Sequence, residues 1–314
     1  MDVLADVLNE MYLSGDVVAR FDLTAPWGVT MPKRGGIFHA IDYGECWTRL
    51  APDGELFKVS PGDLVIFPEG ASHEMVNDPE SLSIPLEEAL CGIEEGSLAC
   101  PVGDIGGTGP QTRFVCGVFH FREGGFHALR SILPPVLHIR ADQGENTQWL
   151  QMILKRLSDE SASTAPGANT ALSRLTDLLF IEGIRVWLES EAATGLSWLR
   201  ALNDPVVCEA LGQIHSDPGQ PWTVASLAAE VGLSRSSFAA HFTNLVGETP
   251  LHYLTSWRMQ LARSWLRGTS LSLGELAERL GYQSDDAFKR AFRREVGSAP
   301  GSYRKQARAE SLAT

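Results

Sequence analysis

Three histidines in or beside strand-like segments are the first candidates for chemistry in this 314-residue sequence. They are His39, His73 and His120, and Glu45 and Cys116 add further donor atoms in the same half of the chain. A catalytic metal site needs three protein ligands and an open coordination position, which these residue types would supply. The same side chains would also suit the few polar positions of an otherwise apolar ligand pocket. At this point both interpretations are open.

His73 follows a short strand-like segment that has turn signals at both ends. In "GDLVIFPEGASHEMVN", residues 62–77, the apolar run Leu64–Phe67 is bounded by Pro and Gly on either side. Similar β-branched or aromatic runs alternate with Gly, Pro and Asp turns throughout residues 1–140. This pattern predicts a small all-β unit.

The five cysteines suggest a second kind of sensing. Because they are odd in number and scattered, free thiols are expected rather than a disulfide framework. Cys91, Cys100 and Cys116 lie in a Gly- and Pro-rich stretch where two thiols could meet, and an exposed thiol of low pKa is readily oxidised. The alternative, favoured by the usual burial of free cysteine, is that they are small core residues.

Charge is distributed unevenly along the chain, whose net charge is −13. Residues 1–202 contain 14 Lys and Arg against 28 Asp and Glu, whereas the remainder contains 12 against 11. This asymmetry indicates two modules with different partners. The N-terminal stretch carries acids where a signal peptide has positive charge, and no apolar run approaches the roughly 18 residues of a membrane span. We therefore expect a cytoplasmic protein that makes no membrane contact.

Helical periodicity begins after Asn146. In both 147–158 and 171–189 apolar residues recur at helical spacing, which predicts two amphipathic helices. Their apolar faces could form a dimer interface or pack only on the β unit.

An internal repeat occupies the C-terminal part of the chain. Residues 224–250 match residues 273–300 with an offset of 49 and then 50 positions. Each copy predicts a short helix, a glycine turn and a second helix, which is a helix-turn-helix unit. The predicted N-caps are Thr223 and Ser234 in the first copy, and Ser272 (with Glu275 as a capping box) and Ser284 in the second.

One long helix is expected to join the two copies. Thr249-Pro250 is a helix-start signal, and Leu254, Trp257, Leu261 and Trp265 recur on one face up to Gly268. Such a helix would hold the two units at a set separation. Two successive major-groove segments on one face of DNA, about 34 Å apart, require this arrangement.

On these residues the segment from 203 to about 308 resembles the AraC/XylS family of transcription regulators, most clearly in "AERLGYQSDDAFKRAFRREVGSAPGSYRK". The N-terminal part is similar to cupin-type sensor domains. The residues that fit the second cupin motif, G-x5-P-x-G-x2-H-x3-N, are Gly62, Pro68, Gly70, His73 and Asn77.

The resemblance implies an α+β protein with three parts. These are a cupin-like effector-binding β-barrel (1–140), a helical dimerisation segment (141–202) and an all-α DNA-binding domain with two helix-turn-helix units (203–314). The implied partners are promoter DNA, a small-molecule effector or redox signal, a second copy of the chain and RNA polymerase. We expect a regulator without catalytic residues or a required cofactor, because a pocket joined to a DNA-binding module has to bind and switch. The competing class is a metal-dependent cupin enzyme with a nucleic-acid-binding appendage.

The resemblance also assigns roles to residues of the sensor. Metal-dependent cupins have an HxH pair, but here His39 is followed by Ile41, so one ligand of that pair is missing. The candidate metal ligands are His39, His73 and His120. The residues predicted to line an effector pocket instead are His39, Trp47, His73 and Phe119.

Helix-turn-helix geometry places the N-terminal half of each second helix in the groove. The residues predicted to contact DNA are Arg235, Ser236, Ser237, Ala240 and His241 in the first copy, and Gln283, Ser284, Lys289, Arg290 and Arg293 in the second. Arg290 is the strongest candidate for guanine, since a bidentate arginine discriminates by about 1 to 3 kcal/mol. The alternative for any one of them is a phosphate contact or a solvated surface position.

Overall fold

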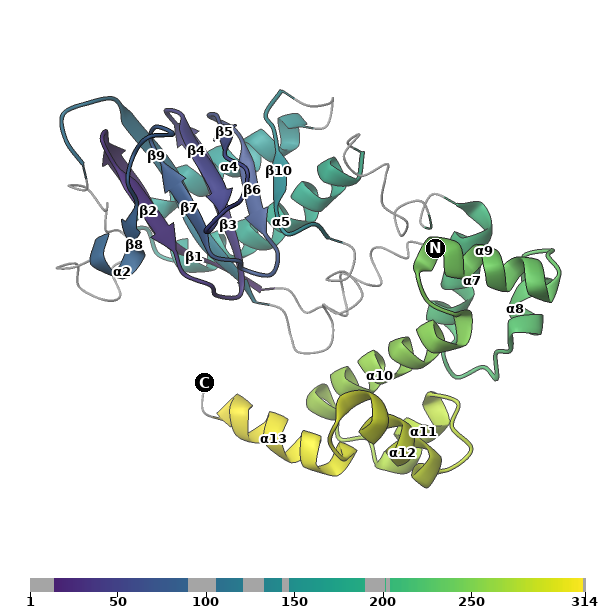
Figure 1. Ribbon diagram of the computed structural model, residues 1–314. Coiled ribbons are helices and arrows are strands. Elements are labelled where there is room, and N and C mark those ends of the chain that lie inside the picture. Colours follow the sequence, from purple (N-terminus) through teal and green to yellow (C-terminus); the bar gives the residue numbers. More distant parts are fainter. Residues whose placement is uncertain are drawn as a thin grey trace. The chain divides into compact units, whose positions relative to one another are not determined.

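The computed structural model describes residues 14–89, 106–120, 133–142, 147–189, 201 and 204–312. These residues group into two compact units, one within 14–189 and the other within 201–312. The first unit contains β-sheets and a helix pair, and the second is helical (Figure 1). The predicted α+β class is confirmed.

Two five-stranded sheets, antiparallel except for the β2–β8 pair, form the framework of the first unit. The first sheet has the order β1 (Ser14–Thr24), β9 (Gln111–His120), β3 (Gly36–Tyr43), β6 (Leu64–Phe67) and β10 (Leu137–Ile139). The second has the order β5 (Phe57–Val59), β4 (Cys46–Leu50), β7 (His73–Val76), β2 (Gly28–Met31) and β8 (Ile84–Pro85). The short helix α2 (Leu86–Ala89) follows β8.

A hydrophobic core contains residues of both sheets. The first sheet contributes Phe21, Phe67 and Phe114, and the second contributes Val29 and Met75, all of them buried. Because side chains of a strand point alternately to its two faces, each strand supplies every second residue to this core.

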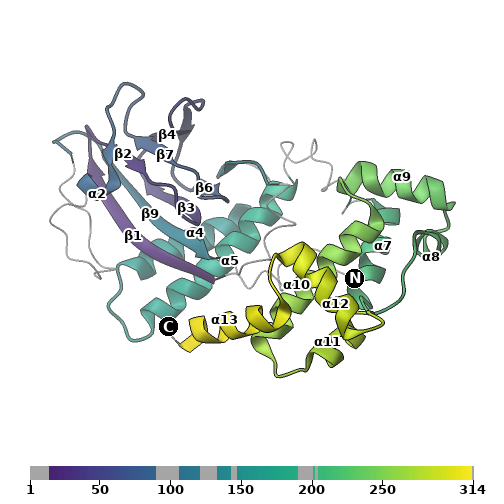
Figure 2. The ribbon, with the colours of Figure 1, turned by 60° about the horizontal axis from the view of Figure 1, so that its bottom comes forward.

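Helices α4 (Thr147–Ser161) and α5 (Ala168–Glu189) pack on each other and on the first sheet, with contacts to β1, β3 and β9 (Figure 2). The predicted helix pair is therefore confirmed. Its apolar face is buried, as at Leu150 and Leu157 of α4. The approach of α5 to β1 is close, because a Cβ added to Gly15 would lie 2.1 Å from Cγ2 of Thr176.

The residues that fit the cupin motif have identifiable structural roles. Gly70 has a φ of +60°, and a Cβ there would lie 1.9 Å from the carbonyl oxygen of Arg34, so only glycine fits the turn. The side-chain oxygen of Asn77 accepts a hydrogen bond of 2.6 Å from the backbone N–H of Trp27. The turn at Gly70 precedes His73 and the hydrogen bond of Asn77 follows it, so the chain is held on both sides of His73.

The second unit consists of seven described helices. They are α7 (Pro205–Ser216), α8 (Val224–Glu230), α9 (Arg235–Val246), α10 (Pro250–Gly268), α11 (Leu273–Arg279), α12 (Asp285–Val296) and α13 (Pro300–Leu312). The linking helix α10 separates the α8–α9 pair from the α11–α12 pair (Figure 1). Within the described part of the chain, none of the helices combines the length and apolar character needed to cross a membrane.

The predicted helix starts agree with the structure. Thr223 and Ser272 form capping boxes, the first with Ser226 and the second with Glu275. Ser234 and Ser284 cap α9 and α12 by accepting hydrogen bonds from backbone N–H groups. The partner of Thr223 is a serine rather than the usual Glu or Gln, which is why the sequence pattern revealed only one of the two boxes.

Candidate nucleic-acid interface and sensor site

Helices α9 and α12 each have one buried and one exposed face. Phe238 and Phe242 of α9 and Phe288 and Phe292 of α12 are fully buried. Because residues four apart lie on the same face of a helix, the phenylalanines direct each helix's opposite face to solvent. This is the orientation that a recognition helix requires.

Most of the residues predicted to contact DNA are exposed. Those exposed are Arg235, Ser236, Ser237, Ala240, Gln283, Ser284, Arg290 and Arg293. Lys289 is half-buried, and its amine lies 3.3 Å from the carboxylate of Asp286. The second helix presents three exposed arginines, Arg290, Arg293 and Arg294, whereas the first presents Arg235 alone.

His241 has a specific partner within the protein. Its Nε2 lies 2.9 Å from Oδ2 of Asp204, the N-cap of α7. The Asp204 carboxylate also accepts backbone hydrogen bonds from Val206 and Val207. Burial raises the pKa of Asp204, but the hydrogen bonds from Val207 and His241 outweigh this effect and hold it below its ordinary value. His241 therefore ties α9 to α7, a role that the sequence pattern did not predict. Asp204 followed by Pro205 was the available signal for the cap.

The two buried histidines of the sensor meet between the sheets. Their Nε2 atoms are 2.6 Å apart, and both side chains are fully buried. The ring of His73 stacks on Phe67 with 3.7 Å between centroids, and His39 contacts the edge of Phe114. The structure thus brings together two of the four side chains predicted to line an effector pocket.

The hydrogen bonds define the tautomers of this pair. Nδ1 of His73 lies 2.8 Å from the carbonyl oxygen of Ala71, which can only accept, so this nitrogen carries the proton. Nε2 of neutral His73 is then an acceptor, and His39 must donate to it from its own Nε2. The remaining nitrogen, Nδ1 of His39, is a buried acceptor for which the described residues supply no donor.

Burial keeps both imidazoles neutral. It lowers the pKa of His73 from 6.5 to about 4, although the hydrogen bond to Ala71 acts in the opposite direction. The pKa of His39 is well below its ordinary value, first because of burial and second because of repulsion from His73. The pair is therefore a neutral hydrogen-bonding unit in an apolar core.

The other candidate metal ligands do not join this pair. His120 is exposed at the end of β9 and lies 3.4 Å from Asp16. Glu45 is exposed and pairs with Lys58. Among the residues that the structure describes, no three His, Cys, Asp or Glu side chains are grouped closely enough to hold a metal ion. The candidate ligand His120 therefore does not join His39 and His73, because it lies at the exposed end of β9.

Two of the predicted pocket residues do not face the core between the two sheets. Phe119 packs on Phe38 and on Phe180 of α5, so it faces the helices. Trp47 alternates with Cys46, a core residue, and is half-buried on the other face of β4. The physical reason is the two-residue period of a strand, which the sequence did not resolve at these positions.

The cysteine hypothesis is corrected at Cys116. This thiol is buried in the core, and burial raises its pKa to about 12. A redox sensor needs an accessible thiolate, which Cys116 therefore does not supply. Cys91 and Cys100 lie outside the described residues.

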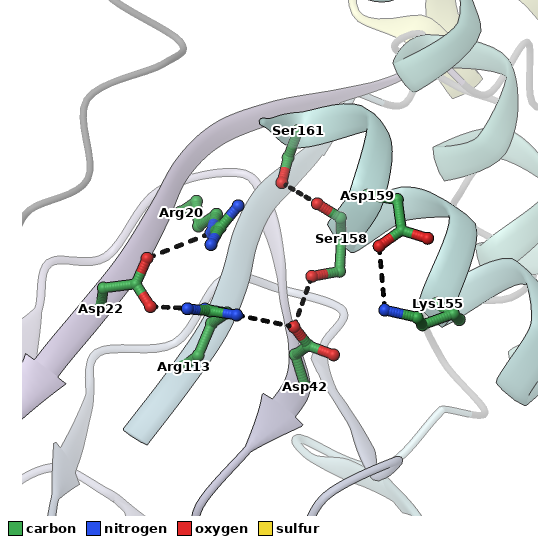
Figure 3. Close-up of polar contacts among 8 residues, drawn as sticks. All are labelled: Arg20, Asp22, Asp42, Arg113, Lys155, Ser158, Asp159 and Ser161. Carbon is green, nitrogen blue, oxygen red and sulfur yellow. Dashed lines mark hydrogen bonds and ion pairs between the residues drawn. The ribbon is translucent and has the colours of Figure 1, made fainter. Parts of the chain in front are cut away.

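A polar connection joins the barrel to α4 (Figure 3). The hydroxyl of Ser158 donates a 2.7 Å hydrogen bond to Asp42 of β3, and Arg113 of β9 lies 3.7 Å from the same carboxylate. Arg113 also binds Asp22 of β1. Beside Asp42 and Ser158 is a hollow of about 300 Å³, lined in part by Lys155 and by residues of β3. Residues far apart in sequence thus connect three strands to the helix pair.

Asp63 is a buried carboxylate that the sequence did not reveal. It accepts hydrogen bonds from His138 (2.9 Å) and from the backbone N–H groups of Ser60 and Ala141. Burial raises the pKa of Asp63, but these hydrogen bonds outweigh it and lower the net value. Asp63 holds the segment after β10 to the turn before β6. His138 and Ala141 are 75 and 78 residues from Asp63, too distant in sequence for spacing to reveal these contacts.

Comparison with known proteins agrees with this two-unit architecture. A cupin family model matches residues 2–189, and a helix-turn-helix domain model matches residues 227–306. The protein is thus a helix-turn-helix DNA-binding protein with an N-terminal cupin domain.

The relatives identify its family. The chain is 31% identical to a Streptomyces lividans protein named as an AraC-like transcription regulator, over 97% of this chain and 98% of that one. It is 30% identical to the transcriptional regulator AlkR of Acinetobacter baylyi, over 98% of this chain and 100% of that one. The chain belongs to the AraC family of transcription regulators.

Among solved structures, the DNA-binding domain of AdpA in complex with a target DNA is 34% identical to this chain. The match covers 34% of this chain and 96% of that one, with a TM-score of 0.33. Membership of the AraC family confirms the prediction of a DNA-binding regulator rather than an enzyme.

The buried histidine pair predicts a pH dependence of stability. Between pH 6.5 and about 4 the unfolded chain protonates His73 while the folded chain does not, so the free energy of unfolding decreases as the pH falls through this range. The decrease amounts to at most about 1.4 kcal/mol per pH unit for each histidine. Urea unfolding at pH 7 and pH 5 should show this loss, and His73→Gln should reduce it. His120→Gln, at an exposed position, is the control and should keep the full loss. An unchanged pH dependence in His73→Gln would contradict the argument.

Proposed function

We propose that this AraC-family protein is a promoter-binding regulator controlled by a small molecule that binds in its cupin domain. The observation that carries the proposal is the unsatisfied Nδ1 of His39, a buried acceptor among the described residues. Burying an acceptor without a donor costs about 1 to 3 kcal/mol, so a ligand with an O–H or N–H group would be favoured there. The surrounding Phe67 and Phe114 rings suit an apolar body on the same ligand.

The polar connection offers a route from this site to the helix pair. His39 and Asp42 lie on the same strand, β3, and Asp42 binds Ser158 of α4. A ligand that displaces β3 would therefore change the contact that holds α4. Effector binding then shifts a population between two states of the helix pair, and the coupling free energy acts on DNA binding. Such a regulator acts where promoter DNA and RNA polymerase are, which is the cytoplasm.

A ligand screen tests this mechanism. The full chain is screened by thermal shift against metabolites, and DNA affinity is then measured with and without the best hit. A ligand at 100 times its Kd should stabilise the sensor by roughly 2.7 kcal/mol. We expect His39→Phe to abolish the shift, and Ser158→Ala to keep the shift but lose the effect on DNA binding. Exposed His120→Ala should change neither. A hit that acts equally on His39→Phe would refute the proposed site.

The DNA-contacting residues are proposed to be the exposed polar residues of α9 and α12, with Arg290 as the principal reader of sequence. Arg290 is exposed on the face opposite the buried Phe288 and Phe292. His241 would contribute through its contact with Asp204 rather than by reading bases.

Arg290→Ala should weaken binding to a duplex selected from a random pool by about 1 to 3 kcal/mol. It should weaken binding to a scrambled duplex much less, because a base contact carries the discrimination. Arg294→Ala is the matched control on the same helix, since Arg294 is paired with Glu295. Titrations at one fixed salt concentration measure both. Equal losses on the selected and scrambled duplexes would identify Arg290 as a phosphate contact instead.

The helix pair is proposed to form a homodimer interface. Trp149 and Met152 are 67% and 62% exposed on α4, and Leu178 is 48% exposed on α5. Trp149 and Met152 are three residues apart and share one face of α4. Large apolar residues gathered on one surface are typical of an interaction site.

Light scattering of the full chain should give twice the chain mass. Trp149→Glu combined with Met152→Glu should give the mass of one chain, because charges would be buried without partners. Leu82→Glu is the control, since Leu82 is 91% exposed but lies outside the helix pair. A wild-type protein that has the mass of one chain with and without effector would exclude the dimer.

A further inference from the structure

The loop between α7 and α8 contacts both the linking helix and the second helix-turn-helix unit. Arg258 of α10 donates from Nε to the carbonyl oxygen of Pro218 (2.7 Å) and from Nη2 to that of Gln220 (2.9 Å). A planar guanidinium that binds two carbonyl groups defines the direction of the loop as well as its distance. The loop is thereby attached to α10 at a point outside the two helix-turn-helix units.

Hydrogen bonds within the loop give it a defined shape. The indole N–H of Trp222 donates to the carbonyl oxygen of Asp217 (2.9 Å), and the Asp217 carboxylate accepts from the backbone N–H of Gln220. The loop that carries the two carbonyl groups bound by Arg258 is therefore also held by hydrogen bonds of its own.

The same loop lies directly against the turn between α11 and α12. A Cβ added to Gly281 would lie 2.2 Å from the carbonyl oxygen of Gly219 and 2.8 Å from Nη2 of Arg258. A Cβ added to Gly219 would lie 2.8 Å from the carbonyl oxygen of Arg279. Only two glycines allow the backbones to approach so closely.

Tyr282 belongs to the second helix-turn-helix unit and also contacts Arg258. The guanidinium carbon of Arg258 lies 5.6 Å from the centre of the Tyr282 ring, within the range of a cation–π interaction. Arg258 thus contacts the α7–α8 loop through its N–H groups, and it contacts the turn between α11 and α12 through the ring of Tyr282. We call Arg258, Gly219, Gly281 and Tyr282 the inter-unit contact.

The first helix-turn-helix unit has no equivalent contact at the matching glycine. Gly232 occupies the same position of the repeat and has nearly the same φ, +69° against +71° for Gly281. However, no described atom lies within 4 Å of a Cβ added to Gly232. Gly232 therefore satisfies only a backbone requirement, whereas Gly281 also permits the approach of another segment.

We propose that the inter-unit contact sets the rotation of α9 relative to α12, and so determines which spacing of two DNA half-sites the protein binds. Helix α10 by itself fixes the distance between the two units along its axis. A contact away from the α10 axis restrains rotation of one helix-turn-helix unit about that axis. The α7–α8 loop provides this contact. Successive major-groove segments differ in both distance and rotation, so both must be defined. The proposal rests on the proposed recognition of DNA by α9 and α12, in which Arg258, Gly219 and Gly281 act as positioning residues.

The test compares DNA duplexes of different half-site spacing. The full wild-type chain first selects duplexes from a random pool, and footprinting locates the two adjacent major-groove segments. One or two base pairs are then inserted between them. The wild type should lose at least about tenfold in affinity on insertion, because contacts to one segment are lost. Arg258→Met and Gly281→Ala should bind the selected duplex more weakly and show a much smaller loss on insertion. Their affinity for a duplex with one segment should equal that of the wild type.

Three controls separate this role from a general effect on folding or charge. Gly232→Ala has the same unfavourable φ as Gly281→Ala but leaves the inter-unit contact intact, so it should keep the spacing preference. Arg258→Lys retains the charge and loses the paired hydrogen bonds, and it should behave like Arg258→Met. Thermal melting confirms that each variant is folded.

Two results would overturn the proposal. One is an unchanged spacing preference in Arg258→Met, and the other is an equal reduction in Gly232→Ala and Gly281→Ala. A wild-type chain that selects no sequence would instead refute the proposed DNA recognition itself. The two failures are therefore distinguishable.

Discussion

Burial of the first sheet on both faces is the constraint on which the sensor unit depends. In β3 and β6 nearly every residue is buried, and in β9 the central residues are. A strand that is apolar on both faces requires a covering layer on each side. The second sheet supplies one layer and the α4–α5 pair supplies the other. The helix pair is therefore part of the sensor's core structure. A displacement of the strands would change the packing of the helices.

The polar groups of this unit lie at places where burial makes them costly unless they are paired. The His39–His73 pair is surrounded by aromatic rings and remains neutral, while Asp42 and Asp63 are held by hydrogen bonds from other elements. Unpaired polar groups in such surroundings destabilise the fold, so each pairing specifies one arrangement of strands and helices. The one acceptor among them that the described residues leave unsatisfied, on His39, is on the same strand as the residue that binds α4.

The DNA-binding unit shows how two copies of one sequence pattern acquire different surroundings. Both copies share capped helices, buried phenylalanines and a glycine turn. In the first copy, His241 is bound to the N-cap of α7, whereas the second exposes Arg290 and Arg293 in the matching region. In the second copy, the turn glycine receives the α7–α8 loop, whereas in the first it faces open space. The units are therefore alike in local structure and unlike in what they contact.

The sequence by itself determined the features that depend on neighbouring residues. Periodicity located α4 and α5, and the caps Thr223, Ser234, Ser272 and Ser284 marked the helix starts, because these signals act within one helical turn. The repeat identified the two helix-turn-helix units, and the cupin spacing drew attention to His73. Only the tertiary structure decided which side of a strand Trp47 and Phe119 occupy, that His120 is remote from His39, and that Cys116 is buried. It also brought together Asp42 with Ser158 and Gly219 with Gly281. These outcomes depend on strand register and on packing between segments far apart in the chain. A one-residue change of register moves every side chain of a strand to the opposite face of the sheet.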